Sequence, residues 1–288
     1  TLLEISRQNG IPHASVCGGK ARCSTCRVRL LEGSTPQQPP EQAERRLLAR
    51  IGAPEGVRLA CQLRPDGEIV VQRLVDPGDA ASGLATQHDP FYWGVERRIT
   101  LMFADIRGFT GISEKNFAFD VVFALNRFQA DMARAIETSG GRVDKYIGDG
   151  LMAIFGSEGA EDAGAAAALR GARAMLGQLE DLNREFRALL GEPLRIGIGL
   201  HSGPAILGRI GGDSRVASLT ALGDTVNVAA RLEELTKTYG AVCVISESTL
   251  DGAIGESSVG QAHETQVRGR AEPLRIRAFA TLADMPTP

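Results

Sequence analysis

Cysteine is the first residue type in this sequence whose spacing could do chemistry. Three thiols lie on one short loop and a fourth on a later segment, in the order Cys17, Cys23, Cys26 and Cys61. Thiolates hold iron–sulfur clusters, and the two glycines of the loop would let backbone N–H groups reach the cluster sulfur atoms. Four thiolates also suit a structural zinc ion, although zinc ribbons usually pair two C-x2-C knuckles and this loop has one.

Two aspartates form a second candidate site. Asp105 follows an apolar run, and Asp149 lies between two glycines in the segment Lys145-Tyr-Ile-Gly-Asp-Gly150. Carboxylates delivered from two separate strands can hold a pair of Mg2+ or Mn2+ ions. After Asp105, a helix start around Gly108 would expose N–H groups to a phosphate. Taken singly, Asp105 is better explained as a helix cap and Asp149 as a turn residue.

A third set of polar residues lies in the segment 220–231. Asn227 and Arg231 are four residues apart, so they share one face of the helix expected there. An amide and a guanidinium that project together can hold a ribose and a phosphate. Combined with the two aspartates, this pair favours a nucleotide site over isolated caps and turns.

Apolar periodicity predicts an α+β chain in which helices and strands alternate. Helices are expected over residues 2–8, 41–50, 117–138, 160–190 and 225–238. Strands are expected over residues 26–30, 57–63, 68–75, 99–104, 194–200, 242–246 and 274–281, with a hairpin around residues 148–150. These elements place the two aspartates at strand ends and the amide and guanidinium on a helix.

Length and charge divide the chain into two domains. With 288 residues, 43% of them hydrophobic, the chain can form about two cored domains, and disorder is excluded as its main state. Residues 1–75 contain 11 Lys and Arg against 7 Asp and Glu, whereas the whole chain has a net charge of −3. We therefore predict one domain over residues 1–75, a linker over residues 76–96, and a second domain over residues 97–283.

The cysteine loop resembles a known family. Residues 11–30 and 59–62 are similar to the adrenodoxin-like [2Fe–2S] ferredoxins, which implies a β-grasp-type domain whose [2Fe–2S] cluster is bound by Cys17, Cys23, Cys26 and Cys61. It also implies a redox partner. Domains of this family usually begin with a β-hairpin before the segment that corresponds to Thr1, and this chain has none. We therefore expect the sheet without its first hairpin.

The remaining motifs resemble the class III nucleotidyl cyclase catalytic domain. They are residues 103–110, 145–151, 198–203 and 220–231, in the order of that family, and the similarity covers about residues 97–281. The resemblance implies a ferredoxin-like βαββαβ core. It also implies that two metal ions are bound by Asp105, Asp149 and the backbone carbonyl of Ile106.

The same resemblance implies which residues contact the substrate. Lys145 and Thr220 correspond to the residues that read the base, Asn227 to the residue that orients the ribose, and Arg231 to the transition-state arginine. Phosphate contacts are expected from Phe109, Thr110 and Arg270. Adenine presents an acceptor at N1 and a donor at its exocyclic amine, which a lysine donor and a threonine acceptor satisfy. Guanine inverts this pattern, so we predict ATP as the substrate.

Chain geometry favours a dimer. Lys145 and Asp149 are separated by at most about 14 Å even in an extended chain, so one chain cannot easily send the lysine to the base and the aspartate to the α-phosphate of one ATP. In the class III family the two residues act in different sites. We therefore expect a head-to-tail homodimer with two equivalent sites.

These features favour an adenylyl cyclase that converts ATP to 3′,5′-cyclic AMP and pyrophosphate under the control of the cluster. Two alternatives stay open: an iron–sulfur electron carrier fused to a catalytically silent cyclase-like scaffold, and a purely structural cluster. The chain has 5% aromatic residues and no dense basic stripe, so nucleic acid is not an expected partner. No apolar run is long enough for a membrane span. The expected location is the cytoplasm, with any membrane anchor upstream of Thr1.

Overall fold

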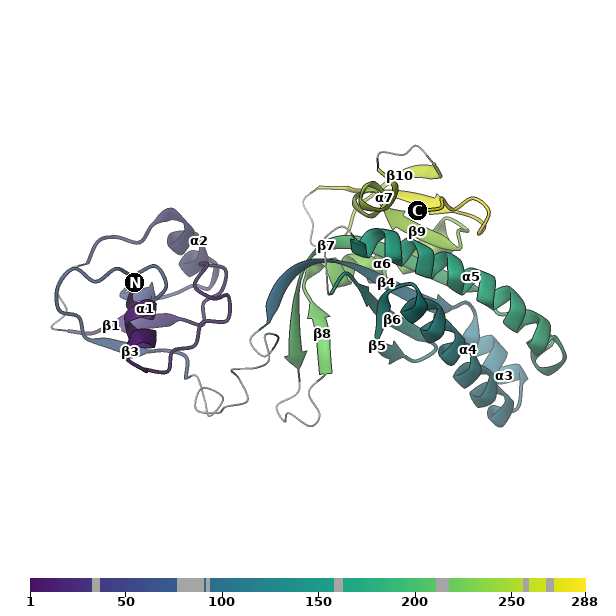
Figure 1. Cartoon of the computed structure of the whole chain (residues 1–288), viewed down its shortest axis with the longest axis horizontal. Coiled ribbons are helices and arrows are strands. Elements are labelled where there is room, and N and C mark those ends of the chain that lie inside the picture. The colour runs from purple at the N-terminus through teal and green to yellow at the C-terminus, as the bar shows by residue number, and fades with distance from the viewer. Residues whose placement is uncertain are drawn as a thin grey trace. The chain divides into compact units, whose positions relative to one another are not determined.

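The computed structural model describes residues 1–32, 37–76, 91, 94–157, 163–210, 218–255, 259–267 and 272–288. These residues form two compact units, which are considered separately (Figure 1). The first unit comprises Thr1–Glu96 with Gly208–Ser218, and the second comprises Arg97–Leu207 with Leu219–Pro288. Most of the linker predicted over residues 76–96 lies outside the described residues. No helix among the described residues is long and apolar enough to cross a membrane.

The N-terminal unit is a small antiparallel sheet with helices packed on it. Its described strands are β1 (Arg27–Leu30), β2 (Val57–Leu59) and β3 (Val71–Arg73), in the order β2-β1-β3. Helices α1 (Leu2–Gln8) and α2 (Gln42–Arg50) accompany them. The core is formed by apolar side chains of these elements together with two of the cysteines, and includes Leu3, Cys26, Val28, Leu59, Cys61 and Leu63. This sheet with its helices agrees with the β-grasp-type fold predicted for the unit.

A buried ion pair joins helix α2 to strand β2. The Glu44 side chain is 1% exposed and accepts hydrogen bonds from Arg58 Nε and Nη2, each at 3.0 Å. It also accepts the backbone N–H of Leu59 at 2.7 Å. Since a buried carboxylate is costly unless it is paired and hydrogen-bonded, these contacts hold α2 in register with the strand that leads to Cys61.

The C-terminal unit contains a larger sheet with the strand order β10-β11-β9-β7-β4-β6-β5, and β8 pairs with β7. The strands are β4 (Val95–Ile106), β5 (Gly141–Ile147), β6 (Gly150–Phe155), β7 (Ile196–Ile210), β8 (Ser218–Leu222), β9 (Cys243–Ser246), β10 (Gln261–Thr265) and β11 (Leu274–Phe279). The order β7-β4-β6-β5 corresponds to the order 4-1-3-2 of a βαββαβ unit. The ferredoxin-like core predicted from the resemblance is therefore confirmed.

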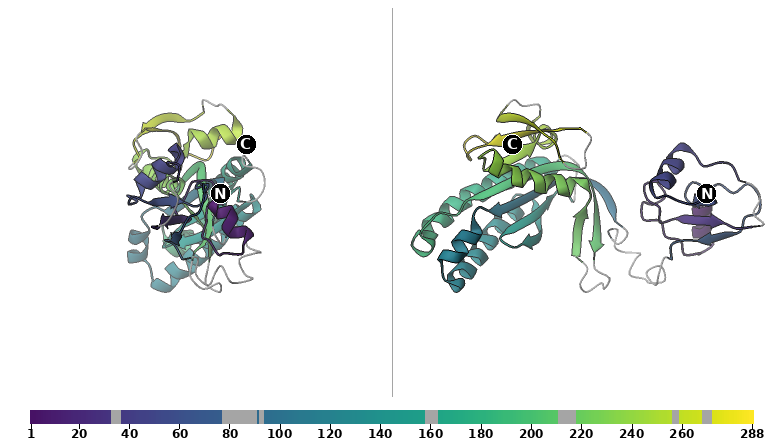
Figure 2. Two further views of the ribbon diagram at one scale, coloured as in Figure 1. Left: turned by 90° about the vertical axis from the view of Figure 1, so that its left-hand side faces the viewer. Right: turned by 180° about the vertical axis from the view of Figure 1, so that it is seen from behind.

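Helices cover both faces of this sheet. Helices α4 (Ala118–Thr138) and α5 (Ala163–Leu190) run side by side on one face, and α6 (Asp224–Thr238) lies on the other, as the view from behind shows (Figures 1 and 2). Successive side chains of β9 point to opposite faces of the sheet. Cys243 and Ile245 therefore join the core under α4 and α5, while Val244 packs with α6. Cys243 is fully buried, as expected for a small hydrophobic residue.

The structure extends and adds to the predicted elements. Strand β7 continues to Ile210, well beyond the predicted end at residue 200, because its second half pairs with β8. Helix α3 (Phe109–Lys115) begins where the helix start around Gly108 was expected, whereas helix α7 (Glu247–Ile254) and strands β8 and β10 were not predicted. Their short, mostly polar sequences have little periodicity, and their conformations depend on packing against distant elements.

Candidate active site and cluster site

The two aspartates of the predicted metal site meet in the folded chain. Strand β4 delivers Asp105 near its end, and the β5–β6 hairpin delivers Asp149, whose carboxylate lies close enough to that of Asp105 to shift its pKa. Gly150 makes this approach possible. A Cβ on Gly150 would lie 2.8 Å from both the Ala104 carbonyl oxygen and Asp105 Oδ1, closer than real Cβ atoms come. The hairpin can therefore reach β4 only with glycine at this position.

Electrostatics at this pair favour a bound cation. Burial raises the pKa of Asp105, and the charge of Asp149 raises it further, while Lys237 opposes the shift. Two carboxylates in contact cannot both ionise cheaply unless a positive charge lies between them. The donor set, two carboxylates beside the end of a strand, fits divalent cations such as Mg2+ and Mn2+.

Glu233, which the sequence analysis did not single out, lies close to this site. It projects from α6 against β7, where a Cβ on Gly197 would come within 2.8 Å of its Oε1. Its residue exposure is 7%, and Oε1 has no hydrogen-bond partner among the described residues. Burial, followed by the charge of Asp105, raises the pKa of Glu233 to about 7, while Lys237 and Arg107 oppose the shift. Only the packing of α6 on the glycines of β7 reveals this group.

Lys145 and Thr220, the predicted base-reading pair, converge on a residue that the sequence analysis also missed. The Thr220 hydroxyl donates to Asp144 Oδ2 at 2.6 Å, and Lys145 Nζ lies 3.3 Å from the same oxygen. The Asp144 side chain is 0% exposed. Two residues that are 75 positions apart in sequence thus share one buried carboxylate.

Asn227 and Arg231 lie one turn apart on α6, and both are exposed. The Arg231 guanidinium donates to Glu234 on the same helix. Because this partner is itself exposed, with 57% of its side chain accessible, the guanidinium can exchange it for another anion at low cost.

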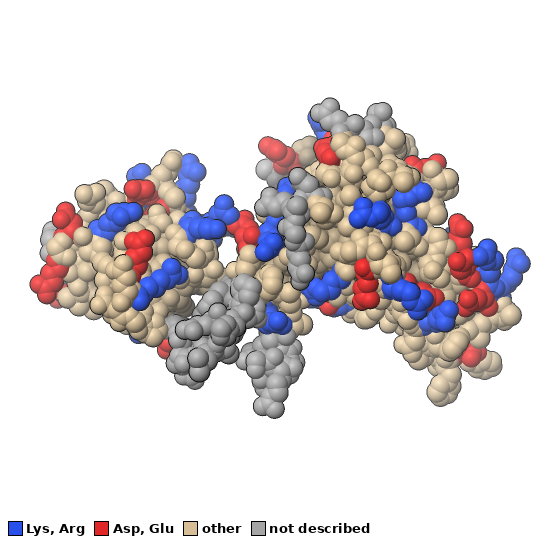
Figure 3. Space-filling view, viewed as in Figure 1, with Lys and Arg blue, Asp and Glu red and all other residues tan. Residues whose placement is uncertain are grey.

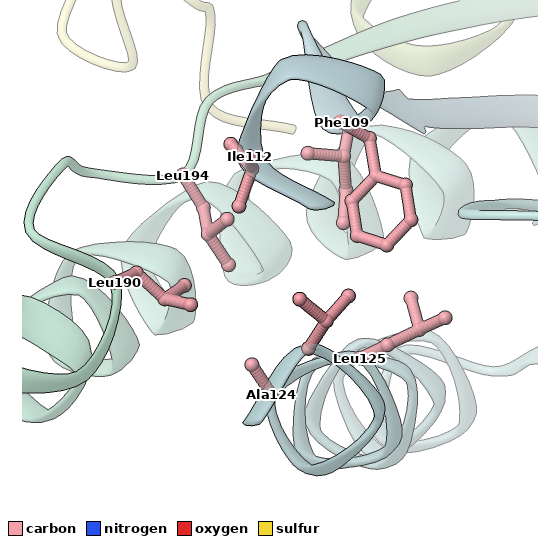
Figure 4. A pocket seen from close by; sticks show the side chains of 8 residues that line it. Phe109, Ile112, Ala124, Leu125, Leu190 and Leu194 are labelled. Atoms are coloured by element: carbon pink, nitrogen blue, oxygen red, sulfur yellow. The ribbon is translucent and has the colours of Figure 1, made fainter. Parts of the chain in front are cut away.

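The residues expected near the phosphates have different surroundings. Ile106 is the buried last residue of β4, and Thr110 is exposed at the start of α3. The Phe109 ring lines a small apolar pocket with Ile112, Leu125 and Leu194 (Figure 4). Any contact of Phe109 with a phosphate therefore has to use its backbone N–H. Arg270 lies outside the described residues.

The four N-terminal cysteines are arranged as two pairs. Cys26 and Cys61 are hydrogen-bonded through their thiols, and the backbone N–H of Cys17 donates to Cys23 Sγ at 3.4 Å. In the described part of the chain, no three His, Cys, Asp or Glu side chains are placed to hold one metal ion. A zinc ion would need all four sulfurs around one point, whereas a [2Fe–2S] cluster takes two thiolates on each iron. Two pairs of thiols therefore fit the cluster better than zinc.

Backbone N–H groups of the cysteine loop favour thiolates. Burial alone would raise the pKa of Cys17, but hydrogen bonds from backbone N–H groups, that of Arg22 foremost, lower it overall. The hydrogen bond from Cys26 lowers the pKa of Cys61 to about 6 despite its burial. Since the thiolate is the ligand form, both groups are prepared to bind iron.

Family comparisons agree with this geometry. Residues 92–279 match the family described as adenylate and guanylate cyclase catalytic domain, and residues 1–66 match the 2Fe-2S iron-sulfur cluster binding domain. The chain therefore belongs to the adenylate and guanylate cyclase family and contains a [2Fe–2S] domain before the catalytic domain.

Individual relatives support the same assignment. An adenylate cyclase of Anabaena cylindrica is 40% identical over 158 residues, which are 54% of this chain and 30% of that protein. A terminal-differentiation-specific adenylate cyclase of Dictyostelium discoideum is 33% identical over 186 residues, 62% of this chain and 8% of that protein. The chain therefore spans less than a third of the length of either relative.

Solved structures include both kinds of cyclase. The guanylyl cyclase Cya2 is 31% identical, with a TM-score of 0.59 over 65% of this chain and 94% of that chain. The adenylyl cyclase CyaB from P. aeruginosa is 28% identical, with a TM-score of 0.56 over 64% of this chain and 94% of that chain. These structures include both a guanylyl and an adenylyl cyclase. The choice between ATP and GTP therefore has to be inferred from this chain's own residues.

Glu233 makes the stability of the catalytic unit depend on pH. Its pKa of about 7 in the folded protein exceeds the ordinary value of 4.5. The unfolded chain therefore loses this proton more readily, and the folded state is destabilised as the pH rises from about 4.5 through 7. We predict that Glu233→Gln raises the free energy of unfolding by up to roughly 3 kcal/mol at pH 8 and by almost nothing at pH 4.5. Urea unfolding without divalent cations, followed by circular dichroism, measures this difference. The exposed Glu180→Gln is the control, and an equal effect at both pH values would contradict the prediction.

Proposed function

We propose that the chain is an adenylyl cyclase that converts ATP to 3′,5′-cyclic AMP and pyrophosphate. The observation that carries this proposal is the meeting of Asp105 and Asp149 at the end of β4, in a chain that also brings Lys145 and Thr220 together. The first pair suits metal ions and phosphates, and the second suits a purine base. An inert scaffold would not need to keep both.

In this proposal, Asp105, Asp149 and the carbonyl of Ile106 hold two divalent ions, Mg2+ or Mn2+. When bound, such ions lower the pKa of the ribose 3′-hydroxyl and stabilise the departing pyrophosphate. Asn227 orients the ribose, and Arg231 leaves Glu234 to contact the charge that develops on the α-phosphorus, a type of contact worth about 3 to 4 kcal/mol. Phe109 and Thr110 contact the phosphates through the start of α3, with Arg270 as a further contact.

Base selection follows from the donor and acceptor groups that the chain offers. Lys145 donates to N1 of adenine, and the Thr220 hydroxyl accepts from the exocyclic amine. Guanine would leave two groups mispaired, each at a cost of about 1 to 3 kcal/mol, which disfavours GTP by roughly a hundredfold or more.

The active enzyme in this proposal is a head-to-tail homodimer. One subunit contributes the aspartates, and its partner contributes Lys145, Thr220, Asn227 and Arg231. Apolar side chains that a monomer leaves in water flank these residues: Tyr146 and Ile147 on the β5 hairpin are 46% and 52% exposed, and Leu222 beside Thr220 is 48% exposed. Burial of such side chains against a second copy would stabilise the dimer.

The dimer can be tested by mixing two inactive variants. Asp105→Asn and Arg231→Ala should each abolish Mn2+-dependent cyclic AMP formation, because every site then lacks a metal ligand or the transition-state arginine. Equal mixing should restore about a quarter of wild-type activity, since half of the dimers are mixed and each of these has one intact site.

Mixing Asn227→Ala with Arg231→Ala is the matched control, because both changes lie on the same half-site and no intact site can form. Cyclic AMP is measured by chromatography after subunit exchange, with ATP and GTP tested in parallel. Failure of the first mixture to recover activity would contradict the shared site. Normal turnover by Asp105→Asn would contradict the metal assignment.

We further propose that the [2Fe–2S] cluster regulates the cyclase in the cytoplasm. Reduction adds one electron to the cluster and so changes the charge of the N-terminal unit by one. A cyclase coupled to this change should turn over at rates that differ at least about fivefold between the oxidised and reduced states, given usual coupling energies. Anaerobic assays before and after dithionite reduction measure the ratio, and Cys61→Ser, which lacks a ligand, should not respond. Equal wild-type rates would favour a structural cluster.

The redox partner in this proposal has an acidic surface. A groove beside Cys23 is lined by Arg46, Leu47 and Arg50 of α2, and within the described residues neither of these arginines has an ion-pair partner. No Asp or Glu occurs between Glu4 and Glu32, the segment that carries three of the cluster ligands. Figure 3 shows lysine and arginine side chains on the part of this unit that carries α2. Charge complementarity therefore favours an acidic electron-transfer protein.

Charge reversal tests this surface. Arg46→Glu with Arg50→Glu should slow electron transfer from a reduced, acidic flavodoxin to the cluster about tenfold at low salt and remove its dependence on ionic strength. Arg29→Glu with Arg45→Glu makes the same change in net charge outside the groove and should have little effect. Stopped-flow absorbance follows the reaction. Equal slowing by the two double variants would show that only net charge matters and would contradict a defined docking groove.

A further inference from the structure

Asp144 lies at an irregularity in strand β5. The β5–β6 register pairs Val143 with Ala153 and Lys145 with Met152, so Asp144 is an extra residue with no opposite partner. A bulge of this kind re-aims a side chain that regular pleating would direct elsewhere. Here it lets the adjacent residues Asp144 and Lys145 meet, and Asp144 Oδ2 lies 3.3 Å from Lys145 Nζ.

The same carboxylate determines how the Thr220 hydroxyl is used. A hydroxyl has one proton to donate, and that of Thr220 goes to Asp144 Oδ2 at 2.6 Å. Thr220 is 4% exposed, so water cannot easily replace this partner. The remaining lone pairs of the hydroxyl oxygen then act only as acceptors. That matches the 6-amino group of adenine and opposes the 6-oxo group of guanine.

Asp144 also accepts two cationic contacts. Besides Lys145, Arg142 Nη2 lies 3.5 Å from Oδ1, and the same Arg142 nitrogen donates to the Leu219 carbonyl at 3.2 Å. The second contact ties strand β5 to the residue before Thr220. The two base-reading side chains are thus held in one network, with the buried carboxylate at its centre.

From this network we propose that Asp144 is a positioning residue that sets the preference of the site for 6-amino purines. It keeps Thr220 as a hydrogen-bond acceptor and holds the Lys145 ammonium beside it. This inference rests on the proposed cyclase function and adds the residue that decides the polarity of the base pocket. Asp144 itself does not touch the base.

Asp144→Asn tests the role with little change in shape. A carboxamide can donate as well as accept, so the Thr220 hydroxyl becomes free to donate to a 6-oxo group. Inosine triphosphate is the suitable competitor, because it has the 6-oxo group and N1–H of guanine without the 2-amino group. We expect the ratio of kcat/KM for ATP to that for inosine triphosphate to fall about tenfold or more.

Two controls separate this role from a structural one. Asp131→Asn removes another fully buried, ion-paired carboxylate, on α4, and should lower stability without changing the ratio. Thr220→Val removes the hydroxyl, and adding Asp144→Asn to that variant should change the ratio much less than it does in the wild type. The affinities of both nucleotides are measured in parallel by displacement of a fluorescent ATP analogue.

The outcomes are distinct. An unchanged ratio in Asp144→Asn, or an equal shift in Asp131→Asn, would overturn the role of Asp144. A wild type that handles ATP and inosine triphosphate equally would also overturn it, while leaving cyclisation intact. If no cyclic product forms from either nucleotide, the proposed function fails. The affinity ratio of wild type and variant then still decides for or against Asp144.

Discussion

The close approach of the β5–β6 hairpin to the end of β4 is the constraint on which the catalytic unit depends. Gly150 lets the hairpin come near enough for Asp149 to meet Asp105, and neither carboxylate relieves the charge of the other. Hydrogen bonds of the β4–β6 ladder and the apolar core beneath it hold the pair together. The fold therefore keeps an unfavourable pair of carboxylates, which is the reason for proposing a cation between them.

One strand serves both halves of the proposed site. The end of β5 leads into the turn with Asp149, while the irregularity at Asp144 turns the strand toward Thr220 on β8. Asp144 lies in the middle of β5 and Asp149 just after its C-terminal end, so one short hairpin carries a group of each proposed half-site. In the proposed head-to-tail dimer, each subunit supplies the group that the partner's half-site lacks.

Local patterns predicted the main elements and the Asp105–Asp149 pair, because apolar periodicity and glycines flanking an aspartate act within a few residues. Asp144 and Glu233 were missed for the opposite reason. In the sequence, Asp144 looks like any polar residue of an exposed strand. Only the shift in the β5–β6 register at this residue shows that its side chain turns inward. Glu233 has the spacing of an ordinary helix residue, and its burial depends on the glycines of β7. Both depend on contacts distant in sequence.

Both units bring several anionic side chains together, thiolates in one and carboxylates in the other, but they offset the cost of ionising them differently. Around Cys17, hydrogen bonds from backbone N–H groups lower the pKa of the thiol, so the protein lowers the cost of the ligand form there before iron arrives. Around Asp105, burial and the charge of Asp149 raise that cost, and Lys237 only partly offsets it. Cation binding at the carboxylates must therefore relieve repulsion as well as form bonds, which links metal loading to the stability of the catalytic unit. At the cysteine site this relief is smaller for Cys17 and Cys61, whose pKa values are already lowered, than for Cys26, whose pKa is raised by its hydrogen bond to Cys61 and by burial.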